Sequence, residues 1–556
     1  MSKIIFIVSV LSCALTLSKS AYSQKHVFYV GINTALVDAQ YAPFNTVIPG
    51  DTICFEAGKR DYILIRNFMG ESGKPIVFIN GNGQVTIDTD HYFGISIQNC
   101  KHIKLTGSGD KKKFYGFNIS RVANGTGIGI GYMSSDFEVD HISISNVLIA
   151  GMYAKTDPEC SLASTRERFT QFNTLIHDNY IENAGNEGLY IGSTKYFGQT
   201  VNCDGKDTLL MPSLLDGVKV YNNIIKYSGW DGIQVSSASS NCQVYDNMVL
   251  FDSQAEVNNQ MSGIIIGGGS KCDCYNNFIS QGKGNGIEIH GLAGFRVFNN
   301  VIIDAGKSFD PSDQSRMKHG IFITDVSAEQ DSSFSILFNT ILTPKSDGIR
   351  FSSIHTKNNL IASNAIINPG NFDYYENGNT RFKGKDAYIM LPDPVSDVLL
   401  KNNYLARNSD NAGFANDGFS LSAGSVLIDS AWSDSKNIMF DYFHTLRPNG
   451  SLSDIGAVEY NPSSAGTIEN KTNRPKLFPN PVKTWLTIQY KVETDSNVFA
   501  GIYNLSGTLV LNSEQKVTPG EIQSMQFNVT SLPPGIYIYS LRSANLSFTG
   551  KFIKSS

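Results

Sequence analysis

A five-residue phrase recurs through the middle of the chain: Gly, apolar residue, any residue, apolar residue, any residue. Such alternation predicts short strands, in which the first and third residues after Gly face a core and the second and fourth face outward. Successive copies lie 23–44 residues apart, which predicts one repeat unit per coil with loop insertions in some coils. The phrase begins at Gly94, Gly127, Gly151, Gly188, Gly232, Gly263, Gly286, Gly320 and Gly348.

A second phrase falls between most of these copies and places an Asn after a short run of alternating apolar residues. An Asn at the same corner of every coil can hydrogen-bond to its copies and to the backbone above and below. It also accepts the left-handed conformation that such a corner needs. We therefore expect a stack of Asn side chains, with the members Asn179, Asn223, Asn247, Asn277, Asn300 and Asn403.

Together the two phrases predict an all-β solenoid of parallel strands, with about three short strands per coil. The short strands, with no helix-period segment between them, do not suit βαβ units. Three further segments, Pro49–Ile53, Ser72–Phe78 and Ser453–Glu459, resemble the opening and closing segments of right-handed parallel β-helix proteins of the pectin-lyase-like superfamily. We place this domain at residues 24–460. The resemblance implies the fold and leaves the activity open, because this fold hosts lyases, hydrolases, epimerases and adhesins.

The first 23 residues have the pattern of a secretory signal peptide. Lys3 precedes an apolar stretch, Ile4–Leu17, and the small-residue site Ala21–Ser23 predicts cleavage before Gln24. The alternative is a single anchor helix, for which the apolar stretch is short. No other apolar run of the sequence is long enough to span a bilayer, so we expect a soluble or surface-attached mature protein.

The last eighty or so residues have a different character. After a polar linker at 461–474, residues 475–556 carry alternating strands such as Trp485–Tyr490 and Gly535–Leu541, separated by turn residues, which predicts a small β-sandwich. The motif Phe478–Pro481 and the segment Leu532–Tyr537 resemble the type A C-terminal sorting domain of the Bacteroidota type IX secretion system. The resemblance implies passage through the outer membrane with the secretion machinery as partner, removal of the tail, and release or surface attachment.

The composition and net charge of the chain limit the kinds of binding partner to be expected. A hydrophobic fraction of 41% excludes global disorder, and a formal charge of -5 gives no reason to expect nucleic acid or an anionic membrane as partner. We expect a monomer. Cys160 and Cys203 lie in insertions of consecutive coils. The sequence allows two alternatives for them, a disulfide that joins the insertions or two free thiols. Cys242 and Cys272 stack in an inward column, and we expect unbonded core residues there rather than a disulfide.

The outward columns of the Gly phrase gather polar and aromatic residues on the middle coils. Aromatic rings pack against sugar faces while carboxylates and amides meet hydroxyls, so these columns predict a polysaccharide-binding groove bordered by the long insertions. The residues expected to bind substrate are Tyr153, Trp230, Gln234 and Arg350. The residues expected to take part in catalysis are Lys155, Asp157, Tyr190, Glu288 and His290.

Two chemistries fit these residues. A lyase acting on uronic acids needs a neutralised substrate carboxylate, a base and an acid; Lys155 serves as the base if its pKa is lowered, and Glu187 with Asp231 could hold Ca²⁺. A glycoside hydrolase needs two carboxylates flanking the bond. The motifs of the polygalacturonase-like and pectate-lyase families are absent, so no catalytic residue carries over. We favour the lyase over the hydrolase, and a non-catalytic glycan-binding or structural surface protein is the rival class.

Overall fold

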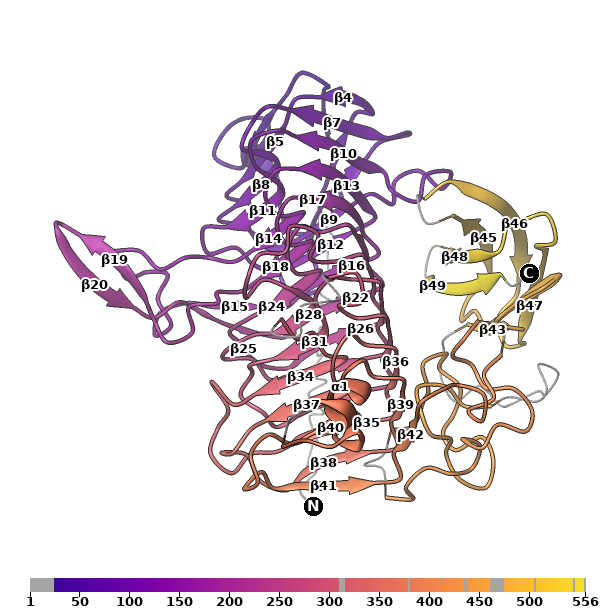
Figure 1. The fold of residues 1–556 in the computed structure, drawn as a ribbon. Coiled ribbons are helices and arrows are strands. Elements are labelled where there is room, and N and C mark those ends of the chain that lie inside the picture. Colours follow the sequence, from indigo (N-terminus) through magenta and orange to yellow (C-terminus); the bar gives the residue numbers. More distant parts are fainter. Residues whose placement is uncertain are drawn as a thin grey trace, which may run out of the picture.

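The computed structural model describes residues 25–309, 316–378, 381–415, 417–434, 438–460, 475–504, 507–543 and 546–554 (Figure 1). The expected signal peptide and the linker at 461–474 lie outside the described residues. Three long parallel sheets form the sides of a rod, and a smaller pair of antiparallel sheets lies beside it. The predicted β-helix and the predicted C-terminal sandwich are both confirmed.

Each coil contributes one strand to each long sheet. The first sheet contains β1 (Val27–Val30), β3 (Thr52–Phe55), β6 (Ile76–Asn80), β9 (Lys101–Thr106), β12 (Ser135–Asp140), β16 (Thr174–His177), β22 (Lys219–Tyr221), β26 (Cys242–Tyr245), β29 (Cys272–Tyr275), β32 (Phe295–Phe298), β35 (Phe334–Leu337), β38 (Asn359–Ala362) and β41 (Val398–Lys401).

The second sheet holds the Gly phrase and is called the Gly sheet below. It contains β2 (Leu36–Asp38), β5 (Ile63–Arg66), β8 (Phe93–Gln98), β11 (Thr126–Gly131), β14 (Met152–Ala154), β18 (Leu189–Ile191), β24 (Ile233–Val235), β28 (Ser262–Ile266), β31 (Asn285–Ile289), β34 (Ile321–Thr324), β37 (Ile349–Ser352) and β40 (Ile389–Met390).

The third sheet follows the Asn corner. It contains β4 (Gly58–Arg60), β7 (Val85–Thr89), β10 (Phe117–Val122), β13 (Ile142–Val147), β17 (Tyr180–Ala184), β23 (Ile224–Lys226), β27 (Met248–Leu250), β30 (Phe278–Ser280), β33 (Val301–Ile303), β36 (Thr340–Leu342), β39 (Ala365–Ile367) and β42 (Tyr404–Ala406). Inward side chains from all three sheets form one continuous apolar core.

The repeated Gly is required by close approach of neighbouring coils. A Cβ atom placed on Gly188 would lie 2.5 Å from Cγ2 of Ile225 in the third sheet and 2.6 Å from the carbonyl oxygen of Gly232 in the next coil. Since real Cβ atoms do not approach so closely, any side chain there would push the coils apart. The same two kinds of neighbour surround Gly127 and Gly151, so the Gly column marks a packing constraint.

The Asn stack forms between the first and third sheets and has eight members. Each side-chain amide donates to the carbonyl oxygen of the next Asn, at 2.9–3.1 Å, and most also donate to a backbone carbonyl of a neighbouring coil. One expectation was wrong: the left-handed conformation falls on the residue before each stacked Asn, such as Asp178 and Asn222. The members are Asn179, Asn223, Asn247, Asn277, Asn300, Asn339, Asn364 and Asn403.

The coils end at Ala406, earlier than the expected domain end. Described residues between 407 and 460 have no named strand and fold back over the rod, where Leu427 and Ile455 pack with Phe338 and other apolar residues of the last coils. Within the described ranges, three short helices interrupt the β structure: η1 (Phe44–Thr46), α1 (Asn371–Asn377) and η2 (Gly384–Ala387).

The long insertions carry structure of their own. Strands β15 (Thr170–Phe172), β21 (Leu214–Asp216) and β25 (Ala238–Ser240) form a small parallel sheet, and β19 (Gln199–Cys203) pairs with β20 (Lys206–Leu210) in a hairpin that projects away from the rod (Figure 1). A disulfide joins Cys160 and Cys203 and links the two insertions. Cys242 and Cys272 are also joined, which corrects the expectation of unbonded core residues: they are direct register partners in adjacent strands, with Cα atoms 4.4 Å apart.

The C-terminal domain is a two-sheet sandwich. One sheet contains β43 (Lys476–Phe478), β44 (Trp485–Tyr490) and β47 (Gln523–Asn528). The other contains, in spatial order, β46 (Leu509–Val517), β45 (Ser496–Tyr503), β48 (Gly535–Arg542) and β49 (Ser547–Lys554). Apolar residues of both sheets, including Leu486, Ile502 and Leu541, fill the space between them.

Candidate functional site

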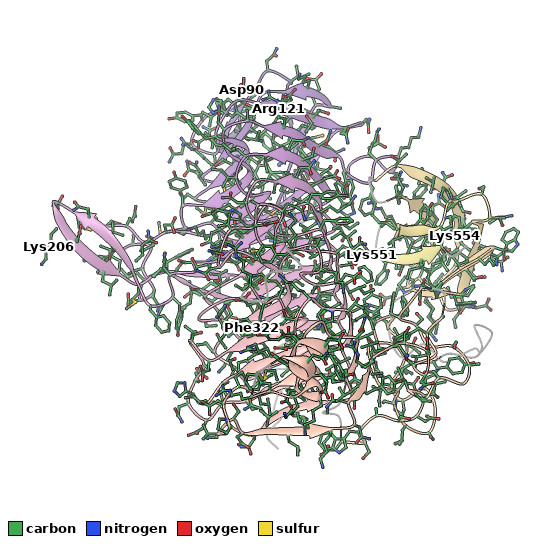
Figure 2. All side chains as sticks on the ribbon, in the orientation of Figure 1. Asp90, Arg121, Lys206, Phe322, Lys551 and Lys554 are labelled. Carbon is green, nitrogen blue, oxygen red and sulfur yellow. A yellow bond between two sulfur atoms is a disulfide. The ribbon has the colours of Figure 1, made fainter. Side chains whose placement is uncertain are left out.

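The outward column of the Gly sheet is in register over seven coils. Because adjacent strands lie about 4.8 Å apart, this column extends roughly 29 Å along the rod. Phe322, labelled in Figure 2, marks its lower part. The column consists of Tyr153, Tyr190, Gln234, Ile265, Glu288, Phe322 and Arg350.

Lys155 lies against two tyrosine rings at one end of this column. Its Nζ is 5.1 Å from the ring centroids of both Tyr153 and Tyr190, and 2.8 Å from Oδ1 of Asp157. The two rings meet edge to face with centroids 4.7 Å apart, and the Tyr190 hydroxyl lies 3.0 Å from that of Thr194. An ammonium beside aromatic faces is suited to a sugar that carries a negative charge.

Lys155 does not meet the condition under which it was expected to serve as a base, namely a lowered pKa. Burial lowers the pKa of Lys155, but its interactions with Tyr190, Tyr153 and the Asp157 carboxylate outweigh burial and raise the pKa above its ordinary value. Lys155 is therefore held as an ammonium ion. Burial also raises the pKa of Tyr153 to about 12, so this phenol stays protonated. This cluster can bind an anion and donate hydrogen bonds.

Glu187 and Asp231 lie on adjacent coils and are buried. Asp231 is 0% exposed, and neither of its carboxyl oxygens has a well-formed hydrogen bond among the described residues. Burial and the negative charges of Glu288, Glu187 and Asp252 raise the pKa of Asp231 well above its ordinary range. Burial likewise raises the pKa of Glu187. The protonated form of Asp231 is thus favoured over a buried, uncompensated charge.

Glu288 and His290 form a second polar cluster further along the column. The Nε2 of His290 lies 2.8 Å from Oε1 of Glu288, and its Nδ1 lies 2.7 Å from Oγ1 of Thr324. Ser262 and Asn285 donate to the other oxygen of Glu288 at 2.6 and 2.7 Å. Although burial raises the pKa of Glu288, these donors and His290 lower it overall. Glu288 is therefore a carboxylate that orients a half-buried imidazole, an arrangement typical of general bases.

The sequence interpretation missed Lys318, which interacts electrostatically with the same cluster and whose Nζ lies 5.6 Å from the centroid of the Phe309 ring. Burial lowers the pKa of Lys318, and the charges of Glu288, Asp231 and Asp252 oppose this shift. Lys318 stands two residues before Gly320, the position that Trp230 occupies before Gly232. Extending the column analysis by one position would have found it, although its loop gave no sign of turning the side chain toward Glu288.

The remaining predicted residues are more constrained than expected. Gln234 is only 2% exposed, and Trp230 is half-buried beside Asp231. Nη1 of Arg350 lies 3.1 Å from Oδ2 of the buried Asp347. Gln234 and Arg350 therefore mainly support the structure around the site.

The predicted residues do not converge in one place. Tyr190 and Glu288 are three register steps apart, about 14 Å along the rod. One cluster contains Tyr153, Lys155, Asp157 and Tyr190, and we call it the tyrosine–lysine cluster. The other contains Asp231, Asp252, Glu288, His290 and Lys318, and we call it the histidine cluster.

A third polar group lies on the first sheet, outside these clusters. Ligand atoms of Glu138, Asp140 and His177 lie within 4.8 Å of one another, as in a metal site. However, Nζ of Lys104 lies 2.5 Å from Glu138 and 2.8 Å from Asp140. Burial lowers the pKa of His177, but Asp178 and Glu138 raise it more, to about 10. The protein thus supplies its own cations to these carboxylates.

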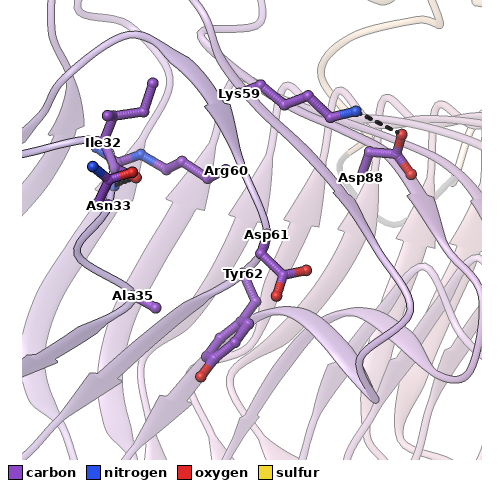
Figure 3. Close-up of a pocket in the computed structure, with 8 residues that line it drawn as sticks. All are labelled: Ile32, Asn33, Ala35, Lys59, Arg60, Asp61, Tyr62 and Asp88. Carbon is purple, nitrogen blue, oxygen red and sulfur yellow. Dashed lines mark hydrogen bonds and ion pairs between the residues drawn. The ribbon is translucent and has the colours of Figure 1, made fainter.

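A hollow of about 360 Å³ lies at the first coils, away from both clusters (Figure 3). Tyr62 and Asp61 line it together with Lys59, whose Nζ lies 3.2 Å from Oδ2 of Asp88. None of the predicted catalytic or substrate-binding residues borders it.

Comparisons with known proteins support the architecture. Residues 213–387 match the model of the right-handed beta helix region, and residues 476–555 match that of the secretion system C-terminal sorting domain. No curated protein matches the chain. The chain is thus a right-handed parallel β-helix protein with a type IX sorting domain, secreted or attached to the cell surface through that system. Among the described residues, no helix is both long and apolar enough to cross a membrane.

Several solved structures are similar in fold. An alginate lyase from Paenibacillus sp. str. FPU-7 is 13% identical, with a TM-score of 0.39, and the match covers 59% of this chain and 98% of the lyase. The A-module of a mannuronan C-5 epimerase from Azotobacter vinelandii is also 13% identical, with a TM-score of 0.29, covering 65% of this chain and 91% of the module. With TM-scores below 0.5, neither likeness carries an argument about this chain.

Proposed function

We propose that the protein binds a uronic-acid-containing polysaccharide along the outward column of the Gly sheet and cleaves it by β-elimination at the histidine cluster. The observation that carries this proposal is the hydrogen-bonded chain from Glu288 through His290 to Thr324, and Glu288 also interacts electrostatically with Lys318. A base and a nearby cation are the two groups that elimination from a uronate needs.

The proposed elimination moves one proton from C5 of the uronate to the leaving oxygen. Lys318 pairs with the uronate carboxylate, which makes the C5 proton more acidic. Because Nε2 of His290 donates to the Glu288 carboxylate, Nδ1 takes that proton in place of its hydrogen bond with Thr324. The bond between C4 and the leaving oxygen then breaks, and a C4–C5 double bond forms. The imidazolium then gives the same proton to the leaving oxygen. Glu288 is a positioning residue that holds the imidazole and stabilises its charged form.

The tyrosine–lysine cluster is the proposed binding subsite for another unit of the same polysaccharide chain. Its ammonium lies against aromatic faces, and Asp157 is 50% exposed at the side chain and can be displaced by a substrate carboxylate. A linear polymer that follows the column would reach both clusters, since they lie about 14 Å apart on one straight register.

A second proposal is that Glu187 and Asp231 bind a calcium ion. The unpartnered oxygens of Asp231 fit a cation that prefers oxygen ligands. Lys318 faces the same carboxylates, and among the described residues only Glu138, Asp140 and His177 bring three ligand atoms within 4.8 Å. If calcium binds, Glu187 and Asp231 would hold it. A thermal shift on calcium addition that is absent in Asp231→Asn tests this.

The experiment is a panel of acidic and neutral polysaccharides, followed by absorbance of the unsaturated uronate and by reducing ends. The proposal predicts new absorbance on an acidic glycan. New reducing ends without absorbance would indicate a hydrolase. Saturable binding without either product would indicate the rival class, a glycan-binding surface protein. The ion pair between Lys155 and Asp157 favours this class, because it already occupies a residue that was expected to be catalytic.

A further inference from the structure

The third sheet carries a second outward column whose residues are apolar except for Thr340. The residue directly after each stacked Asn points away from the core, while the next residue, such as Ile181 or Ile225, points into it. An outward apolar row on a solenoid side is costly in water, so it needs a cover. The described members in order are Tyr180, Ile224, Met248, Phe278, Val301, Thr340, Ala365 and Tyr404.

Two parts of the chain cover this column. The segment after the last coil covers its lower half, where Phe419, Ala457 and Val458 pack with Val301. The sorting domain covers its upper half, where Tyr503 and Ile538 pack in one cluster with residues of the rod. The rod residues of that cluster are Phe114, Tyr115, Tyr180, Ile224 and Met248, which we call the docking surface.

The outer face of the sorting-domain sheet β46-β45-β48-β49 carries apolar residues, Tyr503 and Ile538, where it meets the rod. Along β45, Val498, Ala500 and Ile502 fill the sandwich core, whereas Tyr503 faces the rod and is 0% exposed. Its ring lies 4.9 Å from that of Phe114. An isolated sandwich would present this second face to water, so its composition fits a partner.

Polar contacts fix the position of the sorting domain. The Nζ of Lys551 donates to the backbone carbonyl of Asp246 at 2.7 Å, at the boundary between sandwich and rod (Figure 2). Burial lowers the pKa of Lys551 to about 8, against the opposing charges of Asp246 and Asp178. The guanidinium of Arg542 lies 5.6 Å from the Phe114 ring. This hydrogen bond joins a charged group of the sorting domain to a backbone carbonyl of the rod, so it exists only while the two parts are docked.

We propose that the β-helix is a specific binding partner of its own sorting domain, which docks as a folded unit on the docking surface with Lys551 at the carbonyl of Asp246. Export then carries a docked tail, and the tail removal that the sorting-domain resemblance implies uncovers an apolar strip on the mature protein. This inference is independent of the proposed lyase activity.

The test uses the full chain with a site-specific protease sequence placed at 461–474. After cleavage of the linker, the two fragments should co-elute on gel filtration at micromolar concentration. Ile538→Asp should release the sorting domain, whereas the matched control Ile522→Asp, at a position 44% exposed on the same domain, should not. Separation of the wild-type fragments, or co-elution of the Ile538→Asp fragments, would overturn the proposal.

Two further variants guard against misfolding of the sandwich. Met248→Asp changes the rod side of the contact and leaves the sorting domain intact, so it should also release the tail. Lys551→Met should weaken association at least tenfold, compared with Lys516→Met on the same domain. If Met248→Asp leaves the fragments together, the sorting domain is held elsewhere and the docking surface is wrongly assigned.

Discussion

Glu288 lies in β31 and His290 directly follows the end of that strand, with Nε2 of the imidazole 2.8 Å from Oε1 of the carboxylate. Two further donors hold the other oxygen of Glu288. The pair is thus fixed from several sides before any ligand arrives, which is what preorganised proton transfer requires.

Substitution of His290 should abolish cleavage while leaving the fold intact. His290→Gln removes the base and should lower kcat by about 10²–10⁴-fold with little change in glycan binding. The matched control is His91→Gln, an exposed histidine on the first coils. Equal activity of His290→Gln and wild type would remove His290 from the mechanism.

Lys155 should contribute to binding rather than to chemistry. Lys155→Met removes an ammonium that a substrate carboxylate can pair with, and one charge-assisted hydrogen bond corresponds to about a tenfold loss of affinity for acidic glycans. Affinity for neutral glycans should stay unchanged. Lys206→Met, at the tip of the projecting hairpin (Figure 2), serves as control. A larger effect on kcat than on KM would contradict the binding role.

The Asn stack should dominate the stability of the middle coils. Asn277 donates to Val244 and Asn300 and accepts two hydrogen bonds from Asn247. Asn277→Ala leaves these buried groups without partners and should lower the free energy of unfolding by at least about 2 kcal/mol. Asn45→Ala, at an exposed position, should change it little. Denaturant unfolding of both variants checks this, and equal midpoints would show that the stack is not stabilising.

His177 gives stability a defined pH dependence. Its pKa in the folded protein is about 10, above the ordinary value of about 6.5. Its protonated form therefore stabilises the fold fully below about pH 6.5, and this contribution is lost as pH rises toward 10. The stability difference between wild type and His177→Gln should be largest near pH 6 and shrink by pH 9.5. A difference that grows with pH would contradict the assigned ion pairs.

Much of the fold could be predicted from the sequence because its repeat leaves two markers per coil. Gly188 and its copies recur because no Cβ fits there, and Asn179 and its copies recur because each bonds to the next. Both are local constraints that every coil repeats. The left-handed residue was misplaced by one position because Asp, Asn, Phe and Ser all occupy it, so composition alone does not mark it.

The site was harder to predict because it depends on contacts between coils. The column that contains Tyr190 and Glu288 follows from strand alternation, but the pairing of Lys155 with Asp157 and two tyrosines, which raises its pKa, depends on side-chain directions. Lys318 stands at a repeat position, two residues before Gly320, but it precedes the strand β34, where strand alternation no longer fixes the direction of a side chain. The end of the coils at Ala406 was missed because the next segment covers the rod without pairing to it.

The most direct test of the central claim is the absorbance of the unsaturated uronate when wild-type protein and His290→Gln are incubated with purified acidic polysaccharides. The account predicts that absorbance rises on at least one such glycan with wild type and not with the variant. No rise with wild type on any acidic glycan, under conditions where binding is measured, would contradict it.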